Sequence, residues 1–187
     1  MERRARSPQG ALMPRPSRAL DGASQSANHE PLSDRRSIPV HQHSVADVLL
    51  DALGAMGVAH AFGVIGGALV PFYGALQRSS LSVVHFRHES GAAFAATEAS
   101  LATGAPTLVF ATTGPGLTNA LTGTINARWE GAKVVLVSGT TPRARRGRFA
   151  LQESHERTLG GCLYGPFGPF DEAASIDDPS ELDRVIH

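Results

Sequence analysis

The stretch TLVFATTGPGLTNALTGTINARWEGAKVVLVSG, residues 107–139, decides the fold class. It opens with a continuous apolar run over residues 107–111, which is typical of a strand that is covered on both faces of a sheet. A Gly-Pro-Gly turn follows, then a predicted helix over about residues 117–128 and a second apolar run over residues 134–137. A strand, a helix and a strand in this order predict two parallel strands joined by a right-handed crossover.

The same alternation extends toward the N-terminus. A helix is predicted from Ser44, whose hydroxyl can cap it, because apolar residues follow at i, i+3 and i+4 spacing. Strands are predicted over residues 59–64 and 82–86, and helices over about residues 69–77 and 89–103. We therefore expect an α/β fold, a doubly wound parallel sheet flanked by helices.

Composition limits the possible functions. The chain has 187 residues, and its 17 basic and 17 acidic side chains cancel, so no overall field favours nucleic acid or a membrane surface. No apolar run is long enough for a transmembrane helix. The lone Cys162 excludes a disulfide framework and a multi-cysteine metal site. It fits a reducing compartment, and we expect a cytoplasmic protein.

Three segments are expected along the chain. Residues 1–43 are rich in Arg, Ser and Pro and lack apolar periodicity, which predicts a disordered tail. Residues 44–175 are predicted to form a single folded domain. Residues 176–187 are expected to begin a further helix, with a cap at Asp178-Pro179-Ser180.

Positions 99–127 contain no charged residue. They include parts of two predicted helices, and surface helices normally carry a charged face. One interpretation is that both helices are buried in the chain's own core. The other, which we place ahead, is that another protein surface covers them.

Three groups of residues lie after predicted strands, where α/β folds bind ligands. Glu89 begins a helix whose dipole favours its ionised form, whereas burial under a ligand favours the protonated form. Such opposed influences suit a group that exchanges a proton with a ligand. The plainer interpretation is a glutamate that merely starts a helix.

The other two groups are glycine-rich turns. Residues 112–119 approach the dinucleotide-binding pattern, but Asn119 replaces its third glycine and no acid follows the next strand. They remain a tight turn that presents N–H groups at a helix start, or a purely structural turn. Residues 63–68 hold three glycines that permit close approach of a ligand to the backbone.

The motifs FGVIGG (62–67), HFRHESGAA (85–93) and TGAPTLVF…VVLVSG (103–139), in this order, resemble one family. It is the N-terminal pyrimidine-binding (PYR) domain of thiamine diphosphate-dependent enzymes, nearest to the acetolactate synthase-like branch. The resemblance covers about residues 44–187. It implies the thiamine diphosphate-binding fold, and a linker helix over residues 176–187 leading toward a central domain that is absent from the sequence.

The resemblance also implies residue roles. Glu89 would be catalytic: it would hydrogen-bond N1′ of the aminopyrimidine and promote the imino tautomer, whose 4′-imine removes the C2 proton. The residues implied to bind the cofactor are Glu89, Gly114, Pro115, Gly116 and Asn119. Those implied to lie near the substrate, a small 2-oxo acid, are Gly66, Gly67 and Gln152. Mg²⁺ and the diphosphate would be held by a partner domain, so no metal ligand is expected in this chain.

Departures from the family pattern leave alternatives open. Residues 97–101 replace a common Asp-Gly-Tyr-Ala-Arg stretch, and nothing after Gly139 matches the family's Gly-Asp-Gly metal motif. The first alternative is that the chain is the aminopyrimidine-activating half of an acetolactate synthase-like or 2-oxo acid decarboxylase-type enzyme. A diphosphate-binding domain on another chain or in a homo-oligomer would complete it. Alternatively the chain is a truncated, inactive remnant, or a non-catalytic α/β interaction module. The intact Glu89 favours the first over the third.

A basic loop over residues 142–148 follows the last predicted strand. Its simpler interpretation is a solvated loop. The more specific interpretation is an anion contact, to an acidic face of a partner or to a phosphate-bearing substrate.

Overall fold

The computed structural model describes residues 43–153, 163 and 168–186. Four parallel strands form one sheet in the order β2-β1-β3-β4. The strands are β1 (His60–Gly63), β2 (Ser82–His85), β3 (Thr107–Ala111) and β4 (Val134–Ser138). The predicted α/β fold with a parallel sheet is confirmed. The predicted tail, apart from His43, lies outside the described residues.

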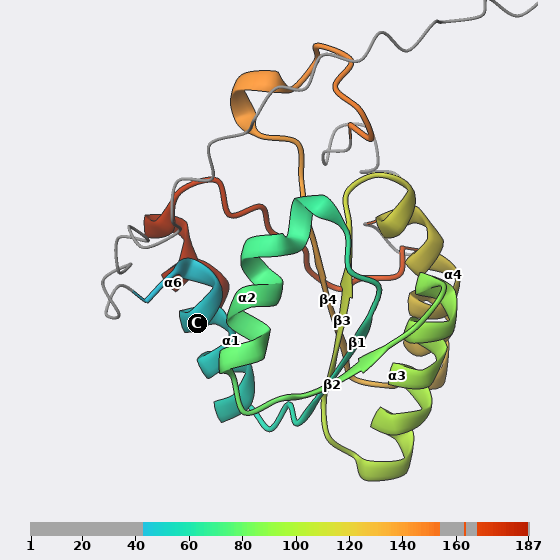
Figure 1. Cartoon of the computed structure of the whole chain (residues 1–187). Coiled ribbons are helices and arrows are strands. Elements are labelled where there is room, and N and C mark those ends of the chain that lie inside the picture. The colour runs from blue at the N-terminus through green and yellow to red at the C-terminus, as the bar shows by residue number, and fades with distance from the viewer. Residues whose placement is uncertain (1–42, 154–162, 164–167, 187) are drawn as a thin grey trace, which may run out of the picture. The chain divides into compact units, whose positions relative to one another are not determined.

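Helices cover both faces of this sheet. α1 and α2 lie on one face, and α3 and α4 lie on the other (Figure 1). Their bounds are α1 (Val45–Ala55), α2 (Val70–Arg78), α3 (Glu89–Thr103) and α4 (Pro115–Glu130). None of the helices in the described part of the chain combines the length and apolar character needed to cross a membrane.

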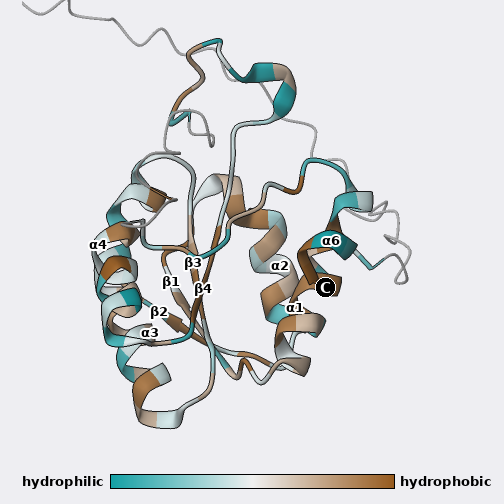
Figure 2. Cartoon of the chain, turned by 180° about the vertical axis from the view of Figure 1, so that it is seen from behind, coloured by the Kyte–Doolittle hydropathy of each residue, from teal (hydrophilic) through white to brown (hydrophobic). Residues whose placement is uncertain are grey.

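The core is divided by the sheet. β3 is buried along its whole length, and its side chains alternate between the two faces. Leu108 and Phe110 belong to the cluster beneath α1 and α2, whereas Val109 packs with Phe62 and the alanines of α3. Figure 2 shows the apolar strands between the two helical layers. A strand covered on both faces explains why residues 107–111 read as a continuous apolar run.

The strand order places a switch point between β1 and β3. The chain leaves β1 for its neighbour β2 on one side, and it leaves β3 for β4 on the other. Connections that diverge in this way leave a crevice outside the carboxyl ends of the two central strands, where open α/β sheets bind ligands. The turns after β1 and β3 are the two glycine-rich groups noted in the sequence.

Caps set the starts of two helices, one beside the glycine-rich turn after β3 and one near the C-terminus. α4 begins at Pro115 rather than at the predicted residue 117, because Gly114 adopts φ 63° at the N-cap and proline is favoured at the first helical position. Near the C-terminus, Asp178 caps the 3-10 helix η3 (Pro179–Glu181), and α6 (Leu182–Ile186) follows it. α6 lies beside α1, and its Leu182 is buried (Figure 1).

The uncharged stretch 99–127 spans the end of α3, all of β3 and most of α4. Much of it is buried inside this chain, including Ser100, Gly123 and Thr124, because α3 and α4 pack on each other and on the sheet. Leu101 and Ile125 remain exposed by 45% and 40%. The chain's own core therefore accounts for the inner side of both helices, and the outer positions within 99–127 remain exposed without charge.

Candidate cofactor-binding site

Glu89 is the first residue of α3, directly after β2. His88 caps the helix, and its Nδ1 accepts a hydrogen bond from the Ser90 N–H at 3.2 Å. The glutamate is 7% exposed, an unusual burial for a carboxylate that has no cationic partner among the described residues. Burial of a charged group requires hydrogen bonds from its surroundings, so its neighbours define the site.

Asn119 supplies one of these hydrogen bonds. Its Nδ2 donates to Glu89 Oε2 at 3.1 Å, from the second turn of α4. In return, Ser90 Oγ donates to the Asn119 carbonyl oxygen at 2.6 Å. The two contacts, which span 30 and 29 residues of sequence, bind the start of α3 to the first turns of α4. The N-terminal parts of both helices thus meet at the Glu89 carboxylate.

The second carboxylate oxygen of Glu89 lies above a glycine. A Cβ built at Gly116 would be 3.2 Å from Glu89 Oε1 and 2.8 Å from Thr112 Cγ2, so a side chain there would crowd the carboxylate. Asn119 binds Oε2, and Oε1 has no hydrogen-bond partner among the described residues. Every fully buried side-chain nitrogen or oxygen of those residues does have a partner, so Oε1 is not completely enclosed by them. It is the carboxylate oxygen left to accept a hydrogen bond from a ligand.

Close approach of the two helices makes this geometry possible. A Cβ added to Gly123 of α4 would lie 2.5 Å from Ala93 Cβ and 2.9 Å from the Phe94 nitrogen. The absence of a side chain at Gly123 lets the α4 backbone rest on α3. Glu89 and Asn119 can touch because small residues hold their helices this close.

The glycine pair after β1 has two different surroundings. A Cβ at Gly66 would lie 2.5 Å from Thr112 Cβ, so this turn packs tightly on the residue that follows β3. At Gly67 nothing lies within 4 Å of an added Cβ. Gly66 thus joins the two turns at the switch point, and Gly67 is open to whatever approaches the sheet edge.

Residues 43–159 match the family described as "Thiamine pyrophosphate enzyme, N-terminal TPP binding domain". The chain belongs to this family. Thiamine pyrophosphate is the cofactor named thiamine diphosphate above. The match covers every strand of the sheet and all four large helices, so the motifs that carried the resemblance lie inside it.

Curated relatives are acetolactate synthases. The chain is 36% identical to "Acetolactate synthase" of Bacillus subtilis (strain 168) over 141 residues, which are 75% of this chain and 24% of that protein. It is 38% identical to "Acetolactate synthase large subunit" of Pyropia yezoensis over 146 residues, 75% of this chain and 24% of that protein. The chain thus spans about a quarter of the length of these relatives.

In this thiamine pyrophosphate enzyme domain, Gln152 also reaches the turn after β3. A Cβ at Gly114 would lie 2.7 Å from the Gln152 carbonyl oxygen and 3.0 Å from its Cβ. Gln152 itself is exposed, as is Pro115. Several of the predicted site residues therefore lie together near the switch point: Gly116 and Asn119 both lie against Glu89, and Gln152 lies against Gly114.

Two residues that contact the site, Thr112 and Ser90, were not among the site residues predicted from the sequence. Thr112 packs against Gly66 and Gly116, and its carbonyl oxygen accepts a hydrogen bond from Ser138 Oγ at 3.1 Å. Ser90 binds Asn119. Both stand beside predicted residues, but a threonine or serine at a helix start is so common as a cap that its type alone gives no signal.

Proposed function

We propose that this chain is the aminopyrimidine-activating half of a thiamine diphosphate enzyme of the acetolactate synthase or 2-oxo acid decarboxylase type. The supporting observation is the Glu89 carboxylate, which is nearly buried, oriented by Asn119 and open at Oε1. When bound, the cofactor supplies a nucleophilic carbon for attack on the carbonyl of a small 2-oxo acid. The relatives named acetolactate synthase support this choice of chemistry.

The residues of the chain would divide the work as follows. Glu89 Oε1 accepts a hydrogen bond from a protonated ring nitrogen of the pyrimidine and so holds that proton in place. Asn119 fixes the carboxylate through Oε2, which leaves Oε1 as the atom that meets the ligand. Gly116 leaves room for the ring, since a side chain there would occupy the space beside Oε1. Gly114 and Pro115 complete the turn, and Gly66, Gly67 and Gln152 lie toward the substrate.

The diphosphate and Mg²⁺ would be held by a partner domain, on another chain or in a homo-oligomer. The residues described here include no group of three or more potential metal-ligating side chains. The apolar side chains Phe94, Leu101 and Ile125, on the outer side of α3 and α4, are exposed by 40 to 45%, and such a partner would cover them.

The proposal is tested by deuterium exchange at C2 of thiamine diphosphate, followed by NMR. The full chain, together with any chain that co-purifies with it from the native host, is mixed with the cofactor and Mg²⁺. Glu89→Gln should slow the exchange by about 10²–10⁴-fold, because the amide cannot hold the ring proton as a carboxylate does. Asp51→Asn, at an exposed carboxylate of α1 on the other face of the sheet, is the matched control and should leave the rate unchanged. Wild-type exchange in Glu89→Gln would remove Glu89 from this role.

An inactive remnant is the second candidate, favoured by the altered segment 97–101. In the fold this segment is well accommodated: Thr97 Oγ1 donates to the Ala93 carbonyl oxygen, and Ser100 Oγ accepts from the Lys133 N–H at 2.9 Å. The helix that carries Glu89 is therefore intact. Affinity purification from the native host separates the candidates. A stoichiometric partner with a Gly-Asp-Gly motif and a downstream Asn supports the split enzyme, and recovery of the chain alone supports the remnant.

A further inference from the structure

The turn that brings Gln152 to the site has an uncommon backbone. Phe149 and Gln152 adopt φ of 56° and 57°, in the left-handed region that residues with a side chain seldom enter. No other non-glycine residue of the described chain has a positive φ. A turn of this kind persists only when surrounding groups hold it in place. Because such strained turns cluster at functional sites, the groups that hold this one indicate a role for it.

The Glu153 carboxylate is one such group. Its Oε1 accepts a hydrogen bond from the Gly147 N–H, and its Oε2 accepts one from the Ala150 N–H at 3.2 Å. The Glu153 N–H donates to the Ala150 carbonyl oxygen at 3.0 Å. One ionised side chain thus bridges both arms of the turn through charge-assisted hydrogen bonds.

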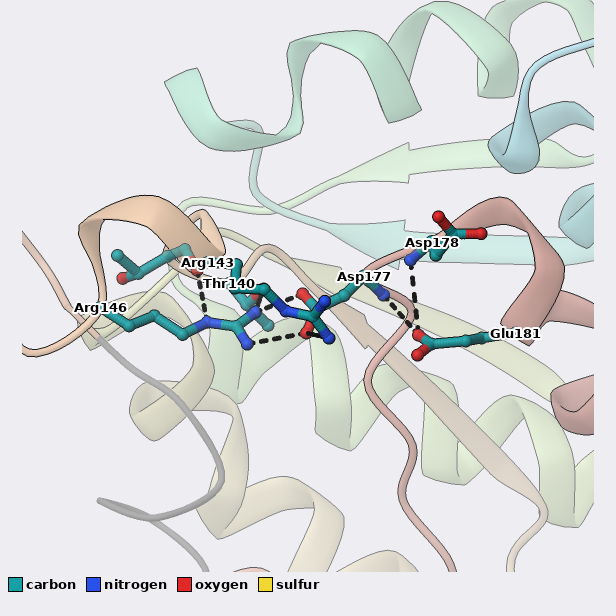
Figure 3. A network of polar contacts seen from close by, with 7 residues as sticks. Thr140, Arg143, Arg146, Asp177, Asp178 and Glu181 are labelled. Carbon is teal, nitrogen blue, oxygen red and sulfur yellow. Dashed lines mark hydrogen bonds and ion pairs between the residues drawn. The ribbon is translucent and has the colours of Figure 1, made fainter.

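Arg146, the residue before Gly147, is held by an acid from a distant part of the sequence (Figure 3). Both terminal nitrogens of Arg146 donate to the Asp177 carboxylate, and Arg146 Nε donates to the Thr141 carbonyl oxygen at 2.8 Å. Arg143 lies 3.6 Å from the same carboxylate. Arg146, one of the arginines of the basic loop, is therefore engaged by an acid of this chain, and the turn starts from an anchored position.

The far end of the turn meets the cofactor site. The Gln152 peptide rests on Gly114, the N-cap residue of α4, the helix that carries Gly116 and Asn119. We infer that Glu153 is a positioning residue that locks the turn of residues 147–153 and thereby holds Gln152 at the mouth of the Glu89 site. This inference rests on the proposed function, because it is a 2-oxo acid that Gln152 would meet there.

Amide hydrogen exchange on the full chain tests the locking. Glu153→Ala should speed exchange of the Gly147 and Ala150 amides by about 10- to 100-fold, since each loses a hydrogen bond to a charged acceptor. Glu153→Gln keeps one oxygen acceptor and should restore protection in part. Glu172→Ala, at an exposed carboxylate elsewhere, is the matched control and should leave both amides unchanged. Wild-type protection in Glu153→Ala would overturn the inference.

Kinetics then separate positioning from general loss of structure. With pyruvate as the probe and the diphosphate-binding partner present, Glu153→Ala should raise KM by about 10- to 100-fold. C2 exchange of the cofactor, which depends on Glu89, should keep the wild-type rate. An equal fall in C2 exchange and in kcat/KM would mean a merely structural role. If the wild-type chain itself shows no C2 exchange, the proposed function fails. If wild type exchanges and Glu153→Ala keeps the wild-type KM, only the positioning role fails.

Discussion

The two faces of the sheet are packed with different kinds of side chain. Beneath α1 and α2, the core consists largely of leucine and phenylalanine, including Leu50, Phe72 and Leu76. Beneath α3 and α4, it consists of Phe62, Val109 and three alanines. Every residue with a proposed contact to the aminopyrimidine lies at the edge of the second face. Large side chains give a face its stability, and small ones let two helix backbones approach closely enough to form a site.

The first prediction concerns the large-residue face. Leu76 in α2 is 1% exposed, and Leu76→Ala should lower the free energy of unfolding by about 2–5 kcal/mol, through lost burial and a cavity. Urea denaturation measures this loss. C2 exchange of the cofactor should keep its wild-type rate below the unfolding transition, because α2 does not touch Glu89.

Leu101→Ala is the matched control for Leu76→Ala. Leu101 is 45% exposed in α3, so the same substitution there removes little buried area. Similar destabilisation at both positions would show that the large-residue face is not the main source of stability, and the contrast between the two faces would fail.

The second prediction concerns the small-residue face. Gly123→Ala places a methyl group 2.5 Å from Ala93 Cβ, so α4 must move away from α3. The expected loss of stability is about 1–3 kcal/mol, less than for Leu76→Ala. C2 exchange should nevertheless slow, because the movement separates Asn119 from Glu89. Compared with Leu76→Ala, Gly123→Ala should therefore cost less stability and more cofactor activation. That opposite order of effects would distinguish the two faces of the sheet.

Gly91→Ala controls for the removal of a glycine from a helix. Gly91 is an exposed residue of α3, and a Cβ there would lie 3.5 Å from the Phe86 ring, an ordinary contact. The substitution should leave C2 exchange unchanged. The free energy of unfolding should stay the same or rise by up to about 0.4–1 kcal/mol. If Gly123→Ala behaves in the same way, the close packing of α3 on α4 is not what positions Glu89.

Patterns of two kinds made the fold predictable. The apolar run of β3 and the alternation of strands with helices predicted the parallel sheet. Glu89 was singled out by its place after a strand, whereas Asn119 was assigned to the site only through the family resemblance. Their hydrogen bond was not predictable, since it depends on how closely α4 rests on α3 at Gly123. The start of α4 was two residues off, because the Gly-Pro-Gly turn is itself the helix start.

The turn at residues 147–153 shows a further limit of sequence patterns. Glycine marks most left-handed positions, and neither Phe149 nor Gln152 carries that mark. The carboxylate that holds the turn, Glu153, lies beside Gln152 in the sequence, but its acceptor role depends on contacts of the folded chain. The clasp between Arg146 and Asp177 joins segments that sequence reasoning treated separately, a basic loop and a linker helix.

The smallest predicted effect lies at the rim of the large-residue face. Asp47 of α1 accepts hydrogen bonds from the Ser44 hydroxyl at 2.7 Å and from Arg78 of α2 at 2.6 Å. The bonds from Ser44, assisted by Arg78, lower the pKa of Asp47 from 3.8 to about 2. Asp47 is thus ionised more readily in the folded chain, so its contribution to stability is present above the unfolded value of 3.8 and is lost as the pH falls toward about 2.

Asp47→Asn should therefore lower the urea midpoint slightly at neutral pH, and the difference from wild type should disappear between pH 3.8 and about 2. The effect stays small and weakens in salt, since the Arg78 side chain is 62% exposed. Asp51→Asn, at an exposed carboxylate on the same helix, is the matched control. A difference between Asp47→Asn and wild type that persists unchanged to pH 2 would mean that the ionised carboxylate is not what joins α1 to α2. C2 exchange should be insensitive to this substitution, because the pair stabilises the face of the sheet that does not carry the site.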